Sequence, residues 1–371
     1  MMSARFLTVV LERAFNMRDG FGREIDYMRI SVIDSCNLNC YYCNPCDNNE
    51  HCHALNILSV KEVLCIVRAA TRLGIKHFRL TGGEPLLHPQ LDEMVLQIKK
   101  IPGVSSVSLT TNAVLLAQHA KWLKEAGIDS INVSLDTIDA SEYERITKKP
   151  LLEEVKHGIN AAIECGIRVK INVVLTPQTD VVALTRYVAK KGTDIRFIEM
   201  MPVGEGHTNG VEPYKKVIGT LSKLYGEPCR INTEKTKEIN SGNDKRKIPD
   251  NGPAEYYIFP ELGIRVGLIQ AIHGKFCDTC NRIRVTADGR LMPCLGSSVT
   301  MDLVPDSWDF ADDAEKDFAI VRALRAAIKA KPRCHNFNDN AVTYTKTTET
   351  KTTEIEAAEV NAARNMSRIG G

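Results

Sequence analysis

Short apolar runs alternate with longer amphipathic stretches between residues 27 and 202 of the chain. The short runs predict buried strands, and the stretches between them repeat apolar residues at helical spacing. The predicted strands are Met28–Ile33, His77–Leu80, Val107–Thr110, Ser130–Leu135, Ile167–Leu175 and Asp194–Met200. The predicted helices are Val60–Leu73, Leu91–Lys100, Leu115–Ala126, Leu152–Glu164 and Val181–Lys191.

This alternation indicates an α/β fold built on a parallel sheet with right-handed crossovers. The count of six strands fits either a partial (β/α)6 TIM-like barrel or a doubly wound sheet. Polar clusters follow several strands at their C-terminal ends, for example Gly82 to Pro85 and Thr110 to Asn112. Because barrels build their sites at that face from several strands, this placement favours the barrel.

The pattern changes after Pro202, where we expect a smaller α+β C-terminal domain. Its predicted helices are Tyr214–Leu224 and Ala314–Lys331, and its predicted strands are Tyr256–Phe259, Ile264–Leu268 and Ile283–Thr286. The expected units are an N-terminal extension at 1–24, the barrel at 25–202, the second domain at 203–337, a flexible linker at 338–365 and a tail at 366–371. The linker is predicted because Thr and Lys dominate it and core-forming residues are few.

Composition narrows the class of protein only slightly. The chain is 43% hydrophobic and 25% charged, and its formal net charge of +2 is too small to argue for nucleic acid or an anionic membrane as a partner. We find no apolar run that could span a bilayer and no convincing signal peptide. Twelve cysteines without a secretion signal are more typical of metal ligands in a reducing compartment, so we expect a cytoplasmic protein.

Cys36, Cys40 and Cys43 place three thiols within eight residues, directly after a predicted strand. Such a set can hold three corners of an iron–sulfur cube and leave one iron open to a ligand, since these clusters normally take four thiolates. A zinc knuckle or three unrelated thiols are the alternatives, although zinc sites more often pair two C-x2-C units.

Cys277, Cys280 and Cys294 form a second set of three, with C-x2-C-x13-C spacing. They suggest another cluster with an open iron. A zinc site completed by His273 or Cys334 is the alternative for this set.

Several basic residues lie near these cysteines or within the predicted strands. In an extended segment Arg282 and Arg284 project to the same side, where two guanidinium groups can grip a phosphate. A solvated basic strand face would explain that pair equally. However, Arg29, Arg79 and Arg196 belong to barrel strands, and buried charges need partners. Convergence of these arginines on one cavity would indicate an anionic ligand such as a polyphosphate.

Taken together, these motifs resemble the GTP 3′,8-cyclase family, the A proteins of molybdenum cofactor biosynthesis within the radical S-adenosylmethionine (SAM) superfamily. The first cysteine set and the Gly82–Pro85 loop are shared by the whole superfamily. The second cysteine set with its arginine pair, and the Gly-Gly end, are specific to the family. The segments that carry the likeness are Gly20–Val32, Cys36–Cys43, Gly82–Pro85, Arg196–Glu199, Cys277–Cys294 and Met366–Gly371.

The resemblance implies a role for each matching position. The SAM-binding 4Fe–4S cluster would be held by Cys36, Cys40 and Cys43, and a second 4Fe–4S cluster that contacts the GTP base by Cys277, Cys280 and Cys294. The implied SAM contacts are Tyr42, Gly83, Ser134 and Met201. The implied GTP contacts are Arg29, Arg79, Thr110, Lys170, Arg282 and Arg284. Arg196 matches the catalytic arginine, and Gly370 and Gly371 match a tail that enters the active site.

The implied reaction is conversion of GTP to 3′,8-cyclo-7,8-dihydro-GTP. A 5′-deoxyadenosyl radical from SAM removes the ribose 3′ hydrogen, and the C3′ radical then attacks C8 of guanine. The implied partners are GTP, a downstream cyclic pyranopterin monophosphate synthase and a reductase, flavodoxin or ferredoxin as electron donor. A homodimer is also expected, without nucleic acid or membrane partners.

Three features depart from the family pattern. Ala113 follows Asn112 where the family commonly has Gly. Cys46 and Cys52 are interpreted as spare thiols, with a role as alternative cluster ligands as the other reading. The linker before the tail is also longer and more polar than the family needs. Two alternative functions are another radical SAM enzyme with an auxiliary cluster, acting on a peptide or an RNA base, and a zinc-stabilised binding module without catalysis.

Overall fold

Twelve strands form one continuous sheet within the part of the chain that the structure describes. This computed structural model describes residues 17–43, 56–203, 210–231, 252–297, 299–303, 313–335 and 337. Six parallel strands form the middle of the sheet and follow one another in chain order. They are β1 (Tyr27–Ser31), β2 (His77–Thr81), β3 (Ser106–Thr111), β4 (Ser130–Ser134), β5 (Val169–Val174) and β6 (Asp194–Ile198).

The strand order decides between the two predicted architectures. In a doubly wound sheet the order reverses at a switch point, whereas β1 to β6 lie side by side in chain order without a reversal. The partial TIM-like barrel is therefore confirmed. The barrel stays open, because β1 pairs on its other side with β10 and β6 pairs with β9.

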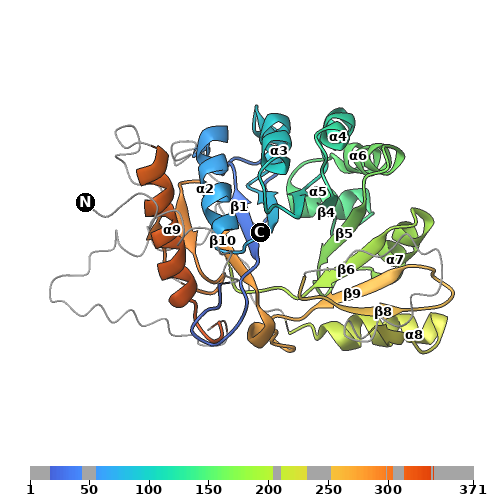
Figure 1. Cartoon of the computed structure of the whole chain (residues 1–371). Helices are drawn as coiled ribbons and strands as arrows, with labels where there is room; N and C mark the ends of the chain where they lie inside the picture. Colours follow the sequence, from blue (N-terminus) through green and yellow to red (C-terminus); the bar gives the residue numbers. More distant parts are fainter. Residues whose placement is uncertain are drawn as a thin grey trace, which may run out of the picture.

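Helices cover the outer face of the parallel strands, as Figure 1 shows. Helix α2 begins at a capping box in which Ser59 and Glu62 each bond the other's backbone N–H. Helix α5 was not predicted; Asp139 caps it, and it buries Tyr143 and Ile146. The helices of this part are α2 (Val60–Arg72), α3 (Leu91–Lys99), α4 (Leu116–Glu125), α5 (Ala140–Thr147), α6 (Leu152–Glu164) and α7 (Val181–Lys190), with a 3-10 turn η1 (Pro85–Leu87).

The C-terminal part of the chain extends the sheet at both ends. The antiparallel strands β7 (Cys229–Ile231) and β8 (Glu255–Ile258) continue outward from β9 (Arg265–Ile269) beside β6. At the other end, β11 (Arg290–Met292) and β12 (Met301–Asp302) continue outward from β10 (Arg282–Val285) beside β1. The remaining elements are a π-helical turn η2 (Tyr214–Ile218), α8 (Gly219–Tyr225), a 3-10 turn η3 (Cys277–Thr279) and α9 (Asp313–Lys329). The predicted boundary at residue 202 therefore lies within one sheet and stays a prediction.

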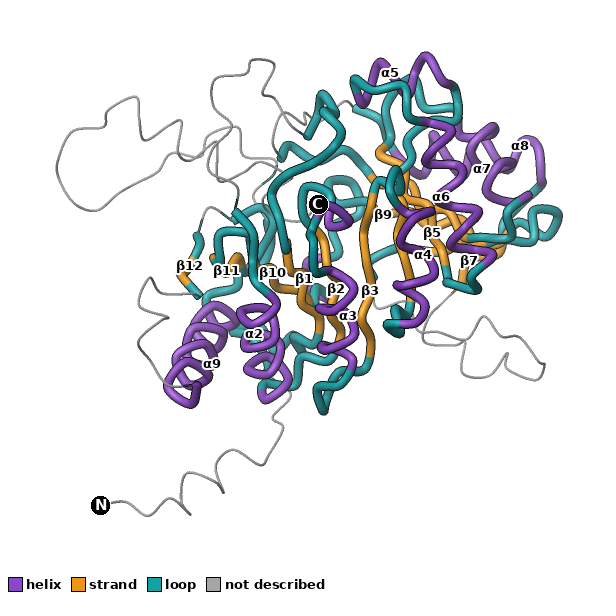
Figure 2. Tube along the Cα trace, turned by 90° about the horizontal axis from the view of Figure 1, so that it is seen from above, coloured by secondary structure: helices purple, strands orange, loops and turns teal. Residues whose placement is uncertain are grey.

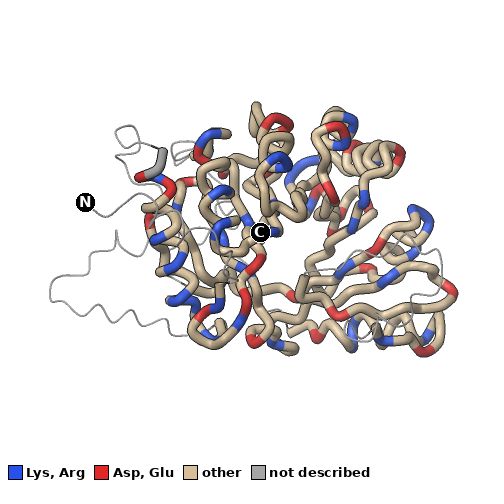
Figure 3. The backbone as a smooth tube through the Cα atoms, viewed as in Figure 1, with Lys and Arg blue, Asp and Glu red and all other residues tan. Residues whose placement is uncertain are grey.

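The core lies between the sheet and the outer helices, where Phe78, Met94 and Phe197 are fully buried. Helix α9 packs beside α2, far from it in sequence, in both Figure 1 and Figure 2. Figure 3 shows acidic and basic residues interspersed along the outer helices. Among the helices described, none has the length and apolar character needed to cross a membrane.

Candidate functional site

A cavity of about 370 Å³ lies inside the barrel, where residues from both ends of the strands line it, and it continues between the C-terminal segments. Every predicted site residue in the described part of the chain lines this cavity. These residues are Arg29, Cys36, Cys40, Tyr42, Cys43, Arg79, Gly83, Thr110, Ser134, Lys170, Arg196, Met201, Cys277, Cys280, Arg282, Arg284 and Cys294. Gly370 and Gly371, the linker at 338–365, Cys46 and Cys52 lie outside the described residues.

The first cysteine set lies on the loop that follows β1. Asn112 donates hydrogen bonds to the Cys36 sulfur at 3.8 Å and to Oδ1 of Asn37 at 2.7 Å. Burial raises the pKa of the Cys36 thiol to about 11 and that of the Cys40 thiol further still. Thiolates at these positions therefore need a cationic partner at neutral pH, and the iron of a cluster would supply one.

Gly82 and Gly83 bring the β2 loop against this cysteine loop. A Cβ added at Gly83 would lie 2.2 Å from the carbonyl oxygen of Ser35, which no real contact tolerates. The Gly83 N–H donates to the carbonyl of Ile33 at 2.8 Å. The close approach thus depends on the missing side chain, and it explains why the Gly-Gly pair stands here.

Glu84, fully buried, joins the loops after β2 and β3. Its carboxylate accepts hydrogen bonds from the Thr111 hydroxyl at 2.7 Å, the Asn112 N–H at 2.7 Å and the Leu86 N–H at 3.0 Å. Ala113 next to it has a left-handed backbone, with φ of 65°. That conformation favours Gly, the residue that the family commonly has, and costs Ala about 1 kcal/mol.

Tyr42 is held by a second carboxylate, that of the half-buried Asp136. The Tyr42 hydroxyl donates to Oδ2 of Asp136 at 2.6 Å, and the Val174 N–H donates to Oδ1 at 2.8 Å. Burial raises the pKa of Asp136 to about 6 despite these two bonds. Asp136 follows β4 and lines the cavity, so it fixes the Tyr42 ring at the cavity wall.

Three arginines stand side by side across neighbouring strands of the barrel. In the register of the sheet, Arg29 of β1 lies opposite Arg284 of β10 on one side and Arg79 of β2 on the other. Arg282, two residues before Arg284, lies on the same cavity face. Like charges directly opposite each other destabilise a sheet, and burial adds to that cost. This row, Arg284–Arg29–Arg79 with Arg282, is called the arginine row below.

The electrostatics of the arginine row indicate that an anion belongs there. Burial, followed by the charge of Arg284, lowers the pKa of Arg29 well below its usual value. Burial and the charge of Arg282 lower the pKa of Arg284 to about 10. The buried Nε atoms of Arg29 and Arg282 have no hydrogen-bond partner among the described residues. A polyphosphate would satisfy both the charges and the free donors.

Further polar residues continue around the wall on β3 to β6. Thr110, Asn132 and Lys170 lie in register on β3, β4 and β5. The next row joins Ser134, Asn172 and Arg196, and Arg196 Nε donates to Oδ1 of Asn172 at 2.9 Å. The two asparagines did not enter the sequence prediction. Polar residues inside otherwise apolar barrel strands were the signal that could have revealed them.

The second cysteine set lies across the cavity on the C-terminal segments. Burial raises the pKa of Cys280, but Arg282 and Lys331 outweigh this effect and lower it to about 7. Arg23 supports the set from outside: its guanidinium pairs with Asp19 at 2.5 Å and donates to the carbonyls of Cys277, Pro332 and Arg333. Sequence reasoning missed both Arg23 and Lys331, because their partners are distant carbonyls.

His273, considered above as a zinc ligand, is engaged elsewhere. Its Nδ1 forms a hydrogen bond with the buried carboxylate of Glu199, which also accepts the N–H groups of Ile272 and His273. Within the described ranges, no three His, Cys, Asp or Glu side chains are placed to hold one metal ion. The thiolates of a 4Fe–4S cluster bind different irons and need not converge on one point.

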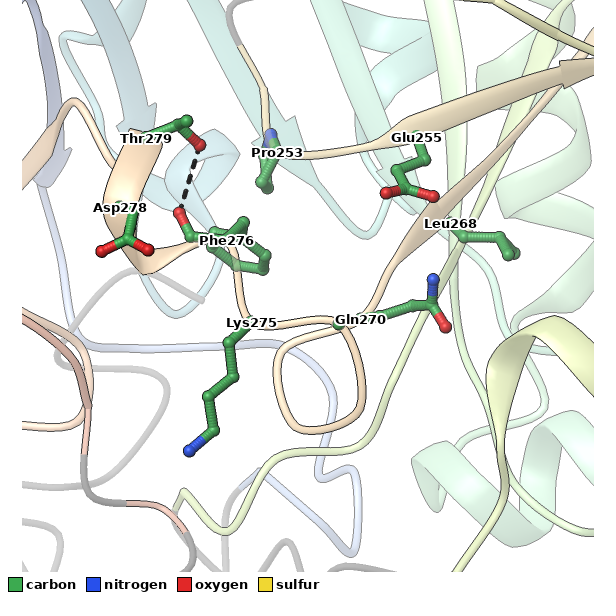
Figure 4. Close-up of a pocket in the computed structure, with 9 residues that line it drawn as sticks. Pro253, Glu255, Leu268, Gln270, Lys275, Phe276, Asp278 and Thr279 are labelled. Atoms are coloured by element: carbon green, nitrogen blue, oxygen red, sulfur yellow. Dashed lines mark hydrogen bonds between the residues drawn. The ribbon is translucent and has the colours of Figure 1, made fainter.

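A smaller pocket of about 220 Å³ adjoins the main cavity and shares Pro253 and Phe276 with it. Figure 4 shows Glu255 and Gln270 across this pocket from Phe276. The Arg282 guanidinium lies over the Phe276 ring at 5.3 Å, so this ring supports the arginine row from behind. The smaller pocket contains none of the predicted site residues.

The donor set fits the groups that the resemblance implies. Two sets of three thiols line the cavity, a glycine cradle adjoins the first, and the arginine row with its free donors lies beside the second. Such a wall can hold two iron–sulfur clusters with an anionic ligand between them.

Comparison with known proteins agrees with this arrangement. Residues 30–183 match the Radical SAM superfamily, and residues 193–337 match the family described as Molybdenum Cofactor Synthesis C. The GTP 3′,8-cyclase of Clostridium perfringens (strain SM101) is 35% identical over 324 residues, which cover 86% of this chain and 95% of that protein. The GTP 3′,8-cyclase of Listeria monocytogenes (strain EGD-e) is 36% identical over 323 residues, covering 86% of this chain and 92% of that protein.

Among solved structures, SuiB of Streptococcus suis bound to the precursor peptide SuiA has a similar fold. The TM-score is 0.53 at 15% sequence identity, and the match covers 87% of this chain and 69% of that one. At this identity the likeness supports the fold and says nothing of the substrate.

Proposed function

The chain belongs to the GTP 3′,8-cyclase family of radical SAM enzymes, and on this premise we propose that its cavity holds SAM and GTP between two 4Fe–4S clusters. The enzyme then converts GTP to 3′,8-cyclo-7,8-dihydro-GTP, the first step of molybdenum cofactor biosynthesis. The observation that carries the proposal is that both cysteine sets and the arginine row line the same cavity.

Cys36, Cys40 and Cys43 hold the first cluster in this proposal, and the fourth iron stays open for SAM. When bound there and reduced by one electron, SAM supplies the 5′-deoxyadenosyl radical that removes the 3′ hydrogen of GTP. Gly83 lets the loop after β2 approach the cysteine loop beside the cofactor site, and Tyr42, fixed by Asp136, lines that site. Ser134 and Met201 complete that side of the cavity.

The arginine row binds the triphosphate. Arg29, Arg79 and Arg284 are adjacent in the sheet register, so a chain of phosphates can be contacted by successive guanidinium groups. Their order in a rigid sheet fixes the ribose relative to the radical source, which is the main contribution that a protein makes to such a reaction. Thr110 and Lys170 extend the contact surface along β3 and β5.

Cys277, Cys280 and Cys294 would hold the second cluster, which would supply a contact to the guanine base. Arg196 serves as the catalytic arginine, oriented by its bond to Asn172. We also propose that the Gly370–Gly371 tail reaches this cavity. The further partners are a reductase, flavodoxin or ferredoxin, a downstream cyclic pyranopterin monophosphate synthase and a second copy of the chain, all in the cytoplasm.

Incubation of the reconstituted protein with GTP, SAM and a strong reductant under anoxia tests the proposal. The expected products are 5′-deoxyadenosine and cyclised nucleotide in equal amounts. SAM cleavage that is indifferent to GTP would favour a radical SAM enzyme acting on a peptide or an RNA base. A colourless protein that binds zinc in place of iron would favour a binding module.

Equilibrium binding of GTP tests the arginine row directly. We expect Arg284→Met to weaken GTP binding at least tenfold, because a charge-assisted hydrogen bond contributes about 1.5–3 kcal/mol. Arg290→Met is the control, since Arg290 lies on β11 with its side chain 51% exposed and paired with Asp288 and Asp302. Equal affinities of the two variants would refute the role of Arg284.

A further inference from the structure

Lys331 is a buried lysine directly behind the second cysteine set. It follows helix α9, lines the main cavity and is 3% exposed. Burying an ammonium group is costly unless hydrogen bonds and charges compensate for the lost water. A position at the end of a helix does not by itself explain why the Lys331 ammonium is buried.

The Lys331 ammonium is held by backbone carbonyls of this site. It donates hydrogen bonds to the carbonyl oxygens of Arg282 and Pro293, each at 2.8 Å. Its charge also contributes to the lowered pKa of the Cys280 thiol. Two of the three N–H groups of the ammonium therefore bond the backbone beside the second cysteine set.

These acceptors belong to two separate stretches of chain. Arg282 begins β10, two residues after Cys280, whereas Pro293 directly precedes Cys294 on the far side of the β10–β11 hairpin. One side chain thus connects the C-x2-C pair to the third cysteine of the set.

We propose that Lys331 is a positioning residue for the second cluster. Its side chain joins the Cys280 side of the set to the Cys294 side, and its charge favours the reduced state of the cluster. Reduction adds a negative charge to the cluster. A buried cation beside a ligand sulfur stabilises that charge and makes the reduction potential more positive. The inference rests on the proposal that Cys277, Cys280 and Cys294 hold a cluster.

The potential of the second cluster in the full chain tests the inference. Cys36→Ala, Cys40→Ala and Cys43→Ala together remove the first set, so that anaerobic reconstitution loads the second alone. In this parent we expect Lys331→Met to shift the midpoint potential, followed by electron paramagnetic resonance, to more negative values. A tenfold change in the ratio of reduced to oxidised cluster corresponds to about 59 mV for one electron.

Two further variants keep the test decisive. Lys331→Gln retains N–H donors for the carbonyls but not the charge, so it should fold and show the negative shift even if Lys331→Met does not fold. Lys329→Met removes an exposed lysine of the same helix end and should match the parent in iron content and potential.

A Lys331→Gln protein with the parent's iron content and potential would overturn the role of Lys331. Loss of iron from the Lys331 variants alone would support the joining role. A parent without bound iron would overturn the assignment of the second cluster itself, and with it this inference.

Discussion

Gly83 shows how one missing side chain shapes the site. A Cβ there would meet the backbone of Ser35 at 2.2 Å and that of Asp34 at 2.6 Å, and backbone cannot rotate away. We expect Gly83→Ala to lower the free energy of unfolding by about 1–3 kcal/mol, as overpacking does, and to weaken SAM binding. Urea unfolding of the cluster-free chain and SAM binding to the reconstituted chain measure the two effects.

Gly219→Ala is the matched control. Nothing lies within 4 Å of a Cβ at Gly219, which begins helix α8 without a positive φ. Alanine should be neutral there or stabilise the helix by less than about 1 kcal/mol. If both variants unfolded at the same urea concentration, the close approach at Gly83 would not affect the free energy of unfolding.

Glu84 makes the stability of the protein depend on pH. Burial raises its pKa to about 7 from an ordinary value of 4.5, and the three donors offset this shift only in part. The folded chain therefore holds a proton that the unfolded chain releases between these values, and stability falls as pH rises from about 4.5 to about 7. Glu84→Gln cannot titrate, so this contribution disappears in the variant.

The measurement is urea unfolding of the cluster-free wild type and Glu84→Gln at several pH values. The stability difference between wild type and variant should decrease from pH 5 to pH 7 and level off above it. If the stability difference between wild type and Glu84→Gln did not depend on pH, the Glu84 carboxyl would titrate in the folded chain as an exposed carboxyl does.

Arg23 acts at the scale of elements, because it fastens the N-terminal segment to two parts of the C-terminal region. Its pair with Asp19 is buried, with side chains 7% and 0% exposed, and it donates to three carbonyls. Removing one partner of a buried pair leaves the other unpaired. We expect Arg23→Met to lower the free energy of unfolding by about 3–5 kcal/mol.

Arg18→Met controls for loss of charge in the same segment, since Arg18 is exposed. It should change stability by no more than about 0.5 kcal/mol. Chemical denaturation compares the two variants, and a small effect of both would mean that water replaces the Arg23 contacts without cost.

At the scale of the whole molecule, the C-terminal strands close both edges of the barrel. Strands β9 and β10 pair in parallel with β6 and β1, so removal of residues 204–371 would expose two strand edges and part of the core. We expect a chain of residues 1–203 to aggregate or to unfold without cooperativity, whereas the full chain unfolds as one unit. Circular dichroism melting and size-exclusion chromatography of both chains test this, and a monomeric, cooperative fragment would contradict it.

Much of the fold and the identity of the chemical groups could be predicted from the sequence alone. The strand and helix periodicity and the polar clusters after the strands are local features, and the partial barrel inferred from them is confirmed. The cysteine spacings likewise predict which thiols belong to each set. The roles assigned to individual residues stay predictions.

Only the tertiary structure decided which distant residues meet. Local periodicity shows that β1 and β10 are strands, but it cannot show that they pair and place Arg29 beside Arg284. The two cysteine sets, the Arg23 contacts and the Lys331 bridge depend on the same pairing. Partner choice between strands is set by the burial of the whole core, and a short stretch of sequence does not contain that information.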